Sequence, residues 1–86
     1  MSSVRLVYFA WVRERIGKDE EEIVLPDSVV TAGDLLRHLK GLGEEYEMAL
    51  EHENVIRVAI NQEHVDHHEP IAGAREIALF PPMTGG

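Results

Sequence analysis

The chain has 86 residues, of which 8 are basic and 16 acidic, and it contains no cysteine. A chain this short can build one core, so we expect a single domain, and without cysteine it forms neither a disulfide framework nor a thiolate metal site. The net charge of −8 disfavours nucleic acid and anionic membranes as partners, and the lack of a signal-type start or a long apolar run predicts a cytoplasmic protein.

The first predicted element is a strand over Val4–Ala10, an apolar run with Arg5 as its only charge. Such a run is typical of a strand covered on both faces, so we expect it in the centre of a sheet. Residues 11–16 follow, with two apolar residues four positions apart just before Gly17. This spacing predicts a short helix that a glycine cap closes.

A charged turn at Lys18–Glu22 and a second strand at Ile23–Leu25, which Pro26 stops, come next. We expect this strand to pair with the first in a hairpin-like arrangement. Adjacent glutamates cannot converge on one metal ion without a folded-back backbone, so we interpret the acidic run as a solvated loop.

The main helix is predicted to begin at Thr31–Asp34, which has the Ser/Thr-x-x-acid form of a capping box. Four leucines follow at helical spacing and predict an apolar stripe that faces the sheet, namely Leu35, Leu36, Leu39 and Leu42. Gly41 and Gly43 are expected to end this helix, and residues 44–50 predict a second short helix.

The last third of the chain predicts three strands, over Val55–Asn61, His64–Asp66 and Arg75–Phe80. In the final strand we expect Ile77 and Leu79 to face the core.

The last six residues, 81–86, carry no charged side chain and are predicted to form an extended tail. Pro81 and Pro82 fix their own φ angles, which makes the start of the tail stiff, whereas Gly85 and Gly86 lack a Cβ atom and give it a flexible tip that can enter a narrow channel. We therefore interpret the Gly86 carboxylate as the reactive group, which the tail places in a partner's cleft. A frayed terminus without function is the alternative.

Four segments resemble the small subunit of molybdopterin synthase, a family of ubiquitin-like sulfur carriers: Phe9–Glu14, Val58–Asn61, Ile77–Leu79 and the ending FPPMTGG. The resemblance covers almost the whole chain, and the FPP-x-TGG ending is its most specific part. It implies an α+β fold of the β-grasp type, with a mixed sheet of five strands on one main helix and a flexible C-terminal tail. The domain would span residues 1–80 and the tail residues 81–86, and the order of the predicted elements agrees with this fold.

The resemblance also implies a mechanism. An E1-like enzyme would use ATP to adenylate the Gly86 carboxylate, and a persulfide on a sulfur-donor protein would then displace AMP to leave a thiocarboxylate. The tail would insert into the large subunit of molybdopterin synthase and give its sulfur to cyclic pyranopterin monophosphate. The chain itself would bind no cofactor.

The implied site residues fall into two groups. Gly86 carries the sulfur and Gly85 provides clearance. The partner-binding residues are Arg13, Phe80, Pro81, Pro82, Met83 and Thr84. For Arg13, a contact with the activating enzyme and a solvated helix face are equally favoured, and for Phe80 so are an exposed anchor and a buried ring.

Two other functions are alternatives to this interpretation. The carrier could serve another pathway, such as thiazole synthesis, or the chain could be a ubiquitin-like modifier, although only Lys18 and Lys40 are available for polymeric chains. No nucleophile elbow, phosphate-binding loop or zinc-type spacing indicates an autonomous active site.

A short histidine-rich segment contains four residues that could bind a metal, which are His64, Asp66, His67 and His68. In an extended chain the same-face positions lie about 7 Å apart, too far to share one ion, so we favour a hydrated loop.

Overall fold

The structure is a computed structural model that describes residues 2–82. Its sheet consists of the strands β1 (Ser2–Tyr8), β2 (Glu20–Leu25), β3 (Arg57–Ile60), β4 (Glu63–Val65) and β5 (Glu76–Phe80). Its helices are α1 (Ala10–Ile16), α2 (Ala32–Lys40) and α3 (Glu44–Ala49), with a 3-10 turn, η1, at Glu53–Val55. The prediction of an α+β fold of the β-grasp type is confirmed.

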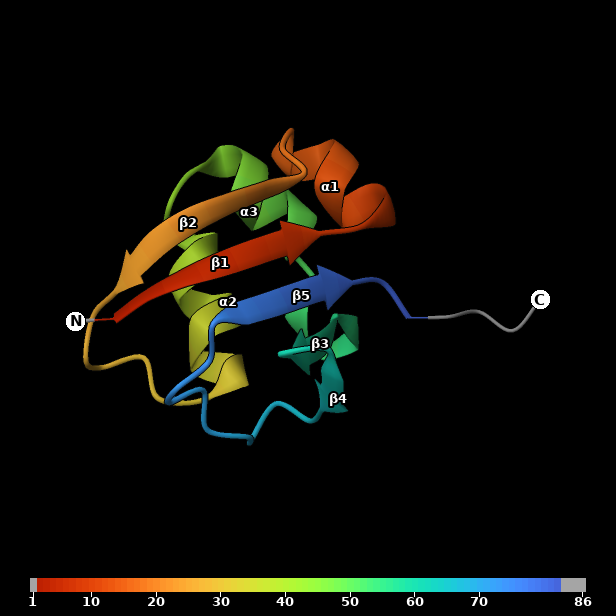
Figure 1. Cartoon of the computed structure of the whole chain (residues 1–86). Coiled ribbons are helices and arrows are strands. Elements are labelled where there is room, and N and C mark those ends of the chain that lie inside the picture. Colours follow the sequence, from red (N-terminus) through yellow and green to blue (C-terminus); the bar gives the residue numbers. More distant parts are fainter. Residues whose placement is uncertain (1, 83–86) are drawn as a thin grey trace.

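The strand order is β2-β1-β5-β3-β4, and β1 and β5 run parallel whereas the other neighbours are antiparallel. Figure 1 shows α2 and α3 behind one face of this sheet, with the other face open. The parallel pair matters for the site, because β1 and β5 end at the same edge of the sheet. The start of α1 and the end of β5 therefore lie on one side of the molecule (Figure 1).

Strand β1 lies inside the sheet, as expected, but the prediction that both its faces are covered is wrong. Val4, Leu6 and Tyr8 are buried under the helices, whereas Ser3 and Arg5 are exposed on the open face. The sequence showed no clear alternation here because Val7, the third residue on the open face, is apolar too.

The acidic run contradicts the prediction of a solvated loop, because residues 20–22 belong to β2. Glu21 points inward, where the hydroxyls of Tyr8 and Tyr46 donate to its Oε2 at 2.7 and 2.6 Å and the Lys18 ammonium donates to its Oε1 at 3.0 Å. We call these four residues the Glu21 cluster. Burial opposes the ionisation of Glu21, but the three hydrogen bonds outweigh it and hold the pKa of this carboxyl below its usual range.

Helix α2 begins as predicted. The Asp34 N–H donates to Thr31 Oγ1 at 3.1 Å, and the Thr31 N–H donates to Asp34 Oδ2 at 3.1 Å, which completes the capping box. Three of the four predicted stripe leucines are fully buried, namely Leu35, Leu36 and Leu39. The prediction that Leu42 belongs to the stripe is wrong, because the helix ends before Gly41 and Leu42 is 47% exposed.

The strand predicted over Val55–Asn61 is shorter than expected, because Val55 belongs to η1 and β3 spans Arg57–Ile60. The other remaining elements lie close to their predicted positions. Gly17 adopts a φ of 88° and caps α1, where a glycine is favoured, and Ile77 and Leu79 of β5 are fully buried. Asn61 forms the turn between β3 and β4, and its Oδ1 accepts the N–H groups of Arg75 and Glu76 at 3.0 and 3.1 Å. This side chain fixes the start of β5, so the opposite end of β5 leaves the sheet at a defined position.

Candidate functional site

The candidate site lies where β5 ends. Phe80 is the last strand residue and is paired with Arg57 of β3, and Pro81 and Pro82 follow it outside the ladder. Proline has no N–H group to donate to a neighbouring strand, which explains why the sheet stops here. The predicted site residues Met83, Thr84, Gly85 and Gly86 lie outside the described residues.

Phe80 is neither a fully exposed anchor nor a buried ring, because its side chain is partly exposed on the open face. The ring centroid lies 5.7 Å from that of His64. The pairing of β5 with its neighbours places Val7, Ala59 and Ala78 on the same face, all partly exposed. We call Val7, Ala59, Ala78 and Phe80 the open-face patch. Its small side chains leave the Phe80 ring as the largest apolar group that a partner could contact there.

Phe9 extends this apolar surface from the other parallel strand. Its N–H donates to the Leu79 carbonyl at 3.1 Å, and its side chain is 47% exposed. Together with Phe80, Pro81 and Pro82 it forms what we call the tail base. From the sequence, Phe9 is recognisable only as part of the Phe9–Glu14 motif, because nothing local to it reveals that β1 pairs with β5.

The backbone next to Phe9 is unusual. Ala10, the first residue of α1, has a φ of 53°, in the left-handed region that residues with a Cβ atom seldom adopt. This turn reverses the chain directly after β1 and leaves Phe9 at the surface. Strained residues of this kind cluster at functional sites, which supports a role for the tail base.

Arg13 projects from α1, and 51% of its side chain is exposed. Its Nε lies 3.8 Å from Asp19 Oδ1, but Asp19 is 84% exposed, so solvent screens this ion pair. The neighbouring Arg15 guanidinium instead stacks over the Trp11 ring at 4.6 Å. A partner can therefore reach the Arg13 guanidinium without breaking a buried interaction, and its predicted contact stays a prediction.

The histidine-rich segment is divided among separate roles. His67 Nε2 lies 2.7 Å from the Ile56 carbonyl, a position in which it donates a hydrogen bond, and His64 contacts Phe80. His68 Nδ1 lies 3.8 Å from Asp66 Oδ1 at a fully solvated position. Within residues 2–82 no group of three or more histidine or acidic side chains could hold a metal ion.

Two further properties bear on function. The part of the chain that the structure describes has no helix that is both long and apolar enough to cross a membrane. A pocket of about 420 Å³ lies at the other end of β5, next to the start of β1.

Comparison with known proteins adds independent findings. The model of the ThiS family matches residues 6–86. The molybdopterin synthase sulfur carrier subunit of Escherichia coli (strain K12) is 34% identical over 83 residues, which is 96% of this chain and 99% of that protein. The corresponding subunit of Haemophilus influenzae is 39% identical over 83 residues, again 96% of this chain and 99% of its own length.

Solved structures agree with this match. The crystal structure of SAMP1 from Haloferax volcanii aligns with a TM-score of 0.72 and 31% identity, covering 99% of this chain and 100% of that one. A putative molybdopterin converting factor, subunit 1, from Pyrococcus furiosus aligns with a TM-score of 0.72 and 26% identity over 96% of this chain and 100% of that one. The resemblance that the sequence indicated is confirmed over nearly the whole chain.

Proposed function

Because the chain belongs to the ThiS family, we propose that it is the sulfur-carrier subunit of a molybdopterin synthase. The observation that carries this proposal is the full-length match to such subunits at 34% and 39% identity. The geometry supports it, because Phe80, Pro81 and Pro82 leave the sheet beside an exposed apolar surface. In this proposal residues 1–80 are the scaffold and residues 81–86 the working tail.

The proposed cycle begins with activation of the Gly86 carboxylate, which does not react with sulfur nucleophiles at neutral pH. On an E1-like enzyme the carboxylate attacks the α-phosphate of ATP, which releases pyrophosphate and forms an acyl-adenylate. The terminal sulfur of a donor protein's persulfide then attacks the acyl carbon and AMP leaves. A thiol reduces the resulting S–S bond, which releases the donor and leaves Gly86 as a thiocarboxylate.

The loaded tail then delivers its sulfur inside the large subunit of the synthase. There cyclic pyranopterin monophosphate accepts the sulfur, and two such transfers build the dithiolene of molybdopterin. Gly86 carries the sulfur and Gly85 lets the tip pass a narrow channel. Residues 81–84 of the tail lie along the walls of this channel.

Docking of the scaffold follows from the surface described above. Phe80 and the rest of the open-face patch contact the large subunit, and Arg13 contacts the activating enzyme. The net charge of −8 repels an anionic pterin phosphate, so the large subunit has to hold the substrate while this chain supplies the tail.

A second candidate is a ubiquitin-like protein modifier, which the likeness to SAMP1, a small archaeal modifier protein, favours. Such a modifier would have little scope to form polymeric chains. Lys18 is held by Glu21 at 3.0 Å and Lys40 by Glu53 at 3.6 Å, so neither lysine of the chain is a ready acceptor for a second copy. A sulfur carrier for thiazole synthesis is the third candidate, and it shares the chemistry of Gly86.

The test is the intact mass of the full chain after incubation with ATP, an activating enzyme and a sulfur source. We expect the mass gain of one oxygen replaced by sulfur, and none in a variant without Gly86. Failure to load with any activating enzyme would overturn the carrier role. Co-purification with a large synthase subunit separates molybdopterin from thiazole synthesis, and isopeptide adducts in cell extracts would favour the modifier.

A further inference from the structure

Strand β2 forms one edge of the sheet, and its outer side is unpaired in the part of the chain that the structure describes. The Arg5 N–H donates to the Arg75 carbonyl at 3.0 Å, on the β5 side of β1. Arg5 therefore exchanges no ladder bonds with Glu22, its opposite residue on β2, and Glu22 turns its own N–H and C=O groups outward. Because the pattern alternates, Glu20 and Val24 do the same. Three residues of β2 thus present a row of backbone donors and acceptors to solvent.

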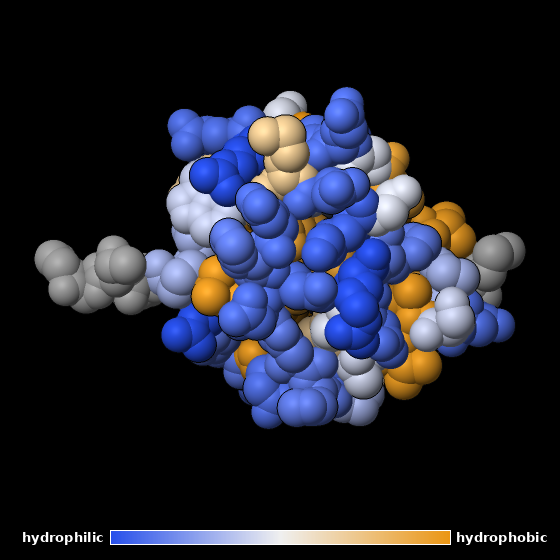
Figure 2. Space-filling model, turned by 180° about the vertical axis from the view of Figure 1, so that it is seen from behind, coloured by the Kyte–Doolittle hydropathy of each residue, from blue (hydrophilic) through white to orange (hydrophobic). Residues whose placement is uncertain are grey.

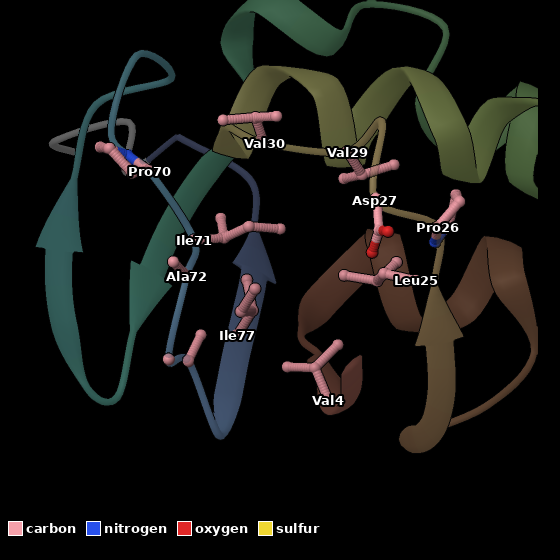
Figure 3. Close-up of a pocket in the computed structure, with 12 residues that line it drawn as sticks. Val4, Leu25, Pro26, Asp27, Val29, Val30, Pro70, Ile71, Ala72 and Ile77 are labelled. Carbon is pink, nitrogen blue, oxygen red and sulfur yellow. The ribbon is translucent and has the colours of Figure 1, made fainter. Parts of the chain in front are cut away.

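A pocket opens where β2 ends. It has a volume of about 420 Å³, within the range of sites that hold a ligand or an anchoring side chain. Figure 3 shows that its walls come from separate segments, with Val4 and Ile77 from the sheet, Leu25 from the end of β2, Val30 from the loop before α2 and Ile71 from the loop before β5. A hydrogen bond of 2.9 Å from the Ile71 N–H to the Val30 carbonyl joins the two loops, so the pocket is a built part of the fold.

Exposed apolar side chains occur both on β2 and at the rim of this pocket. Val24 is 58% exposed and Val30 54% exposed, although burial of a valine is favourable by about 1.5 kcal/mol or more. Figure 2 shows that the helix-covered side is mostly hydrophilic and that apolar colour gathers toward the margin at the right, which is the side of the β1 start in Figure 1. Exposed apolar side chains beside a pocket are typical of an interaction site.

We propose that the outer edge of β2 and the pocket at its end bind an extended, basic segment of a partner protein. The segment adds a strand to β2 through the outward N–H and C=O groups of Glu20, Glu22 and Val24, and it places one apolar side chain in the pocket. Strand addition gives affinity, and the pocket selects the apolar anchor.

The charge on the edge identifies the occupant as basic. The side chains of Glu20 and Glu22 stand on the open face next to the edge, and Glu22 accepts a hydrogen bond from the Ser3 hydroxyl at 2.9 Å. The cationic group described beside them is the Arg5 guanidinium, which lies 3.9 Å from Glu20 but 2.7 Å from Glu76. Lysine or arginine at alternate positions of the added strand would lie over these carboxylates. A second copy of this chain is a poor occupant, because it would bring its own acidic β2 and a net charge of −8.

The pocket lies apart from the tail base, since it adjoins the start of β1 whereas the tail base adjoins the end of β1. Strand β1 also separates β2 from β5. The inference rests on residues 2–82 and not on the proposed sulfur chemistry. A partner could occupy the edge of β2 while the tail is engaged elsewhere.

The test is a titration of the isotopically labelled full chain with capped hexapeptides, followed by NMR. One peptide alternates lysine with valine, isoleucine and leucine, a second carries glutamate in place of lysine, and a third carries proline in the middle of the basic sequence. We expect the basic peptide to shift the amide signals of residues 20–25 and the methyl signals of Val30 and Ile71. We expect the acidic and proline peptides to bind at least about tenfold more weakly.

Two variants sharpen the test. Val30→Asp places a charge at the mouth of the pocket and should weaken the basic peptide by about tenfold or more, whereas Val55→Asp, a matched change at another exposed valine, should not. The double variant Glu20→Lys, Glu22→Lys should reverse the preference toward the acidic peptide. Both changes lie on exposed side chains, and thermal unfolding checks that the fold is retained.

Other outcomes overturn the proposal. If no peptide binds at millimolar concentration, the glutamates only protect the edge from aggregation. Shifts confined to the tail base would assign peptide binding to that surface instead. Concentration-dependent dimerisation that Val30→Asp abolishes would identify a second copy as the occupant.

Discussion

Two neighbouring residues at the end of β1 belong to regions that the molecule uses in opposite ways. Tyr8 is buried in the Glu21 cluster, where its hydroxyl and that of Tyr46 donate to one carboxylate oxygen. Phe9, the next residue, is 47% exposed at the tail base and lies beside a left-handed Ala10. The polar atoms of the Glu21 cluster satisfy one another, whereas the tail base leaves aromatic surface uncovered.

The two regions therefore serve different purposes, one in stability and the other in binding. The Glu21 cluster joins β1, β2 and α3 and leaves little for a partner to bind, so we expect it to contribute to stability alone. The tail base contributes few internal contacts through its side chains, so we expect changes there to affect binding and sulfur transfer while the fold persists. If this holds, substitutions in the two regions separate effects on stability from effects on function.

The largest effect is expected at the tip of the tail. Gly85→Val should lower sulfur transfer to the large subunit by about a hundredfold or more, since a branched side chain cannot pass a channel shaped for glycine and a small misplacement of a reacting atom is costly. Gly85→Ala should give a smaller loss. Single-turnover transfer measures both, and thermal unfolding should change by less than about 0.5 kcal/mol. Full activity of Gly85→Val would refute the proposed role of Gly85.

The next effect concerns docking. Phe80→Ala should weaken binding to the large subunit by about 2 kcal/mol, or about thirtyfold, because it removes the largest apolar group of the open-face patch. Isothermal titration calorimetry measures this change. The matched control is Met48→Ala, which truncates a side chain that is 66% exposed on α3. Equal losses in the two variants would show that the open-face patch is no anchor.

In the Glu21 cluster we expect a loss of stability without a loss of sulfur loading. Glu21→Ala leaves the hydroxyls of Tyr8 and Tyr46 without their acceptor and should lower the free energy of unfolding by about 1–3 kcal/mol. Glu22→Ala, an exposed neighbour, should cost less than about 1 kcal/mol. Chemical denaturation measures both. Sulfur loading by Glu21→Ala at a temperature where it is folded should equal that of the unchanged chain. A specific loss of loading would contradict the purely stabilising role of the Glu21 cluster.

The contribution of Glu21 to stability should also depend on pH, in a direction that its lowered pKa determines. The folded state lowers the pKa of Glu21, so the unfolded state takes up a proton first as the pH falls. The contribution of the carboxylate is therefore fully present above the ordinary glutamate value of about 4.3 and is lost as the pH falls through the lower value of the folded state. The stability difference between the unchanged chain and Glu21→Gln should shrink across this window. A difference that stays constant down to pH values well below it would contradict the assignment.

The contrast between the two regions also explains what the sequence could predict. Local patterns foretold the α2 capping box, its three buried leucines and the alternation of β5, because each depends on residues close together in the chain. The inward position of Glu21 was missed because its hydrogen-bond donors come from β1 and α3. The exposed Phe9 was missed for the same kind of reason, since only the parallel pairing of β1 with β5 brings it beside Phe80.

The smallest effect tests whether the tail base stores strain. Ala10→Gly removes the Cβ atom that makes the φ of 53° unfavourable and should stabilise the fold by about 0.5–1 kcal/mol, even though glycine also increases the entropy of the unfolded chain. The control is Ala72→Gly, an exposed loop alanine outside the left-handed region, where only the entropic loss applies. If Ala10→Gly is more stable but binds the large subunit less tightly, the strained turn holds Phe9 in position for docking. If Ala10→Gly is destabilised as much as Ala72→Gly, the left-handed turn stores no strain, and the tail base differs from the Glu21 cluster only in its exposure.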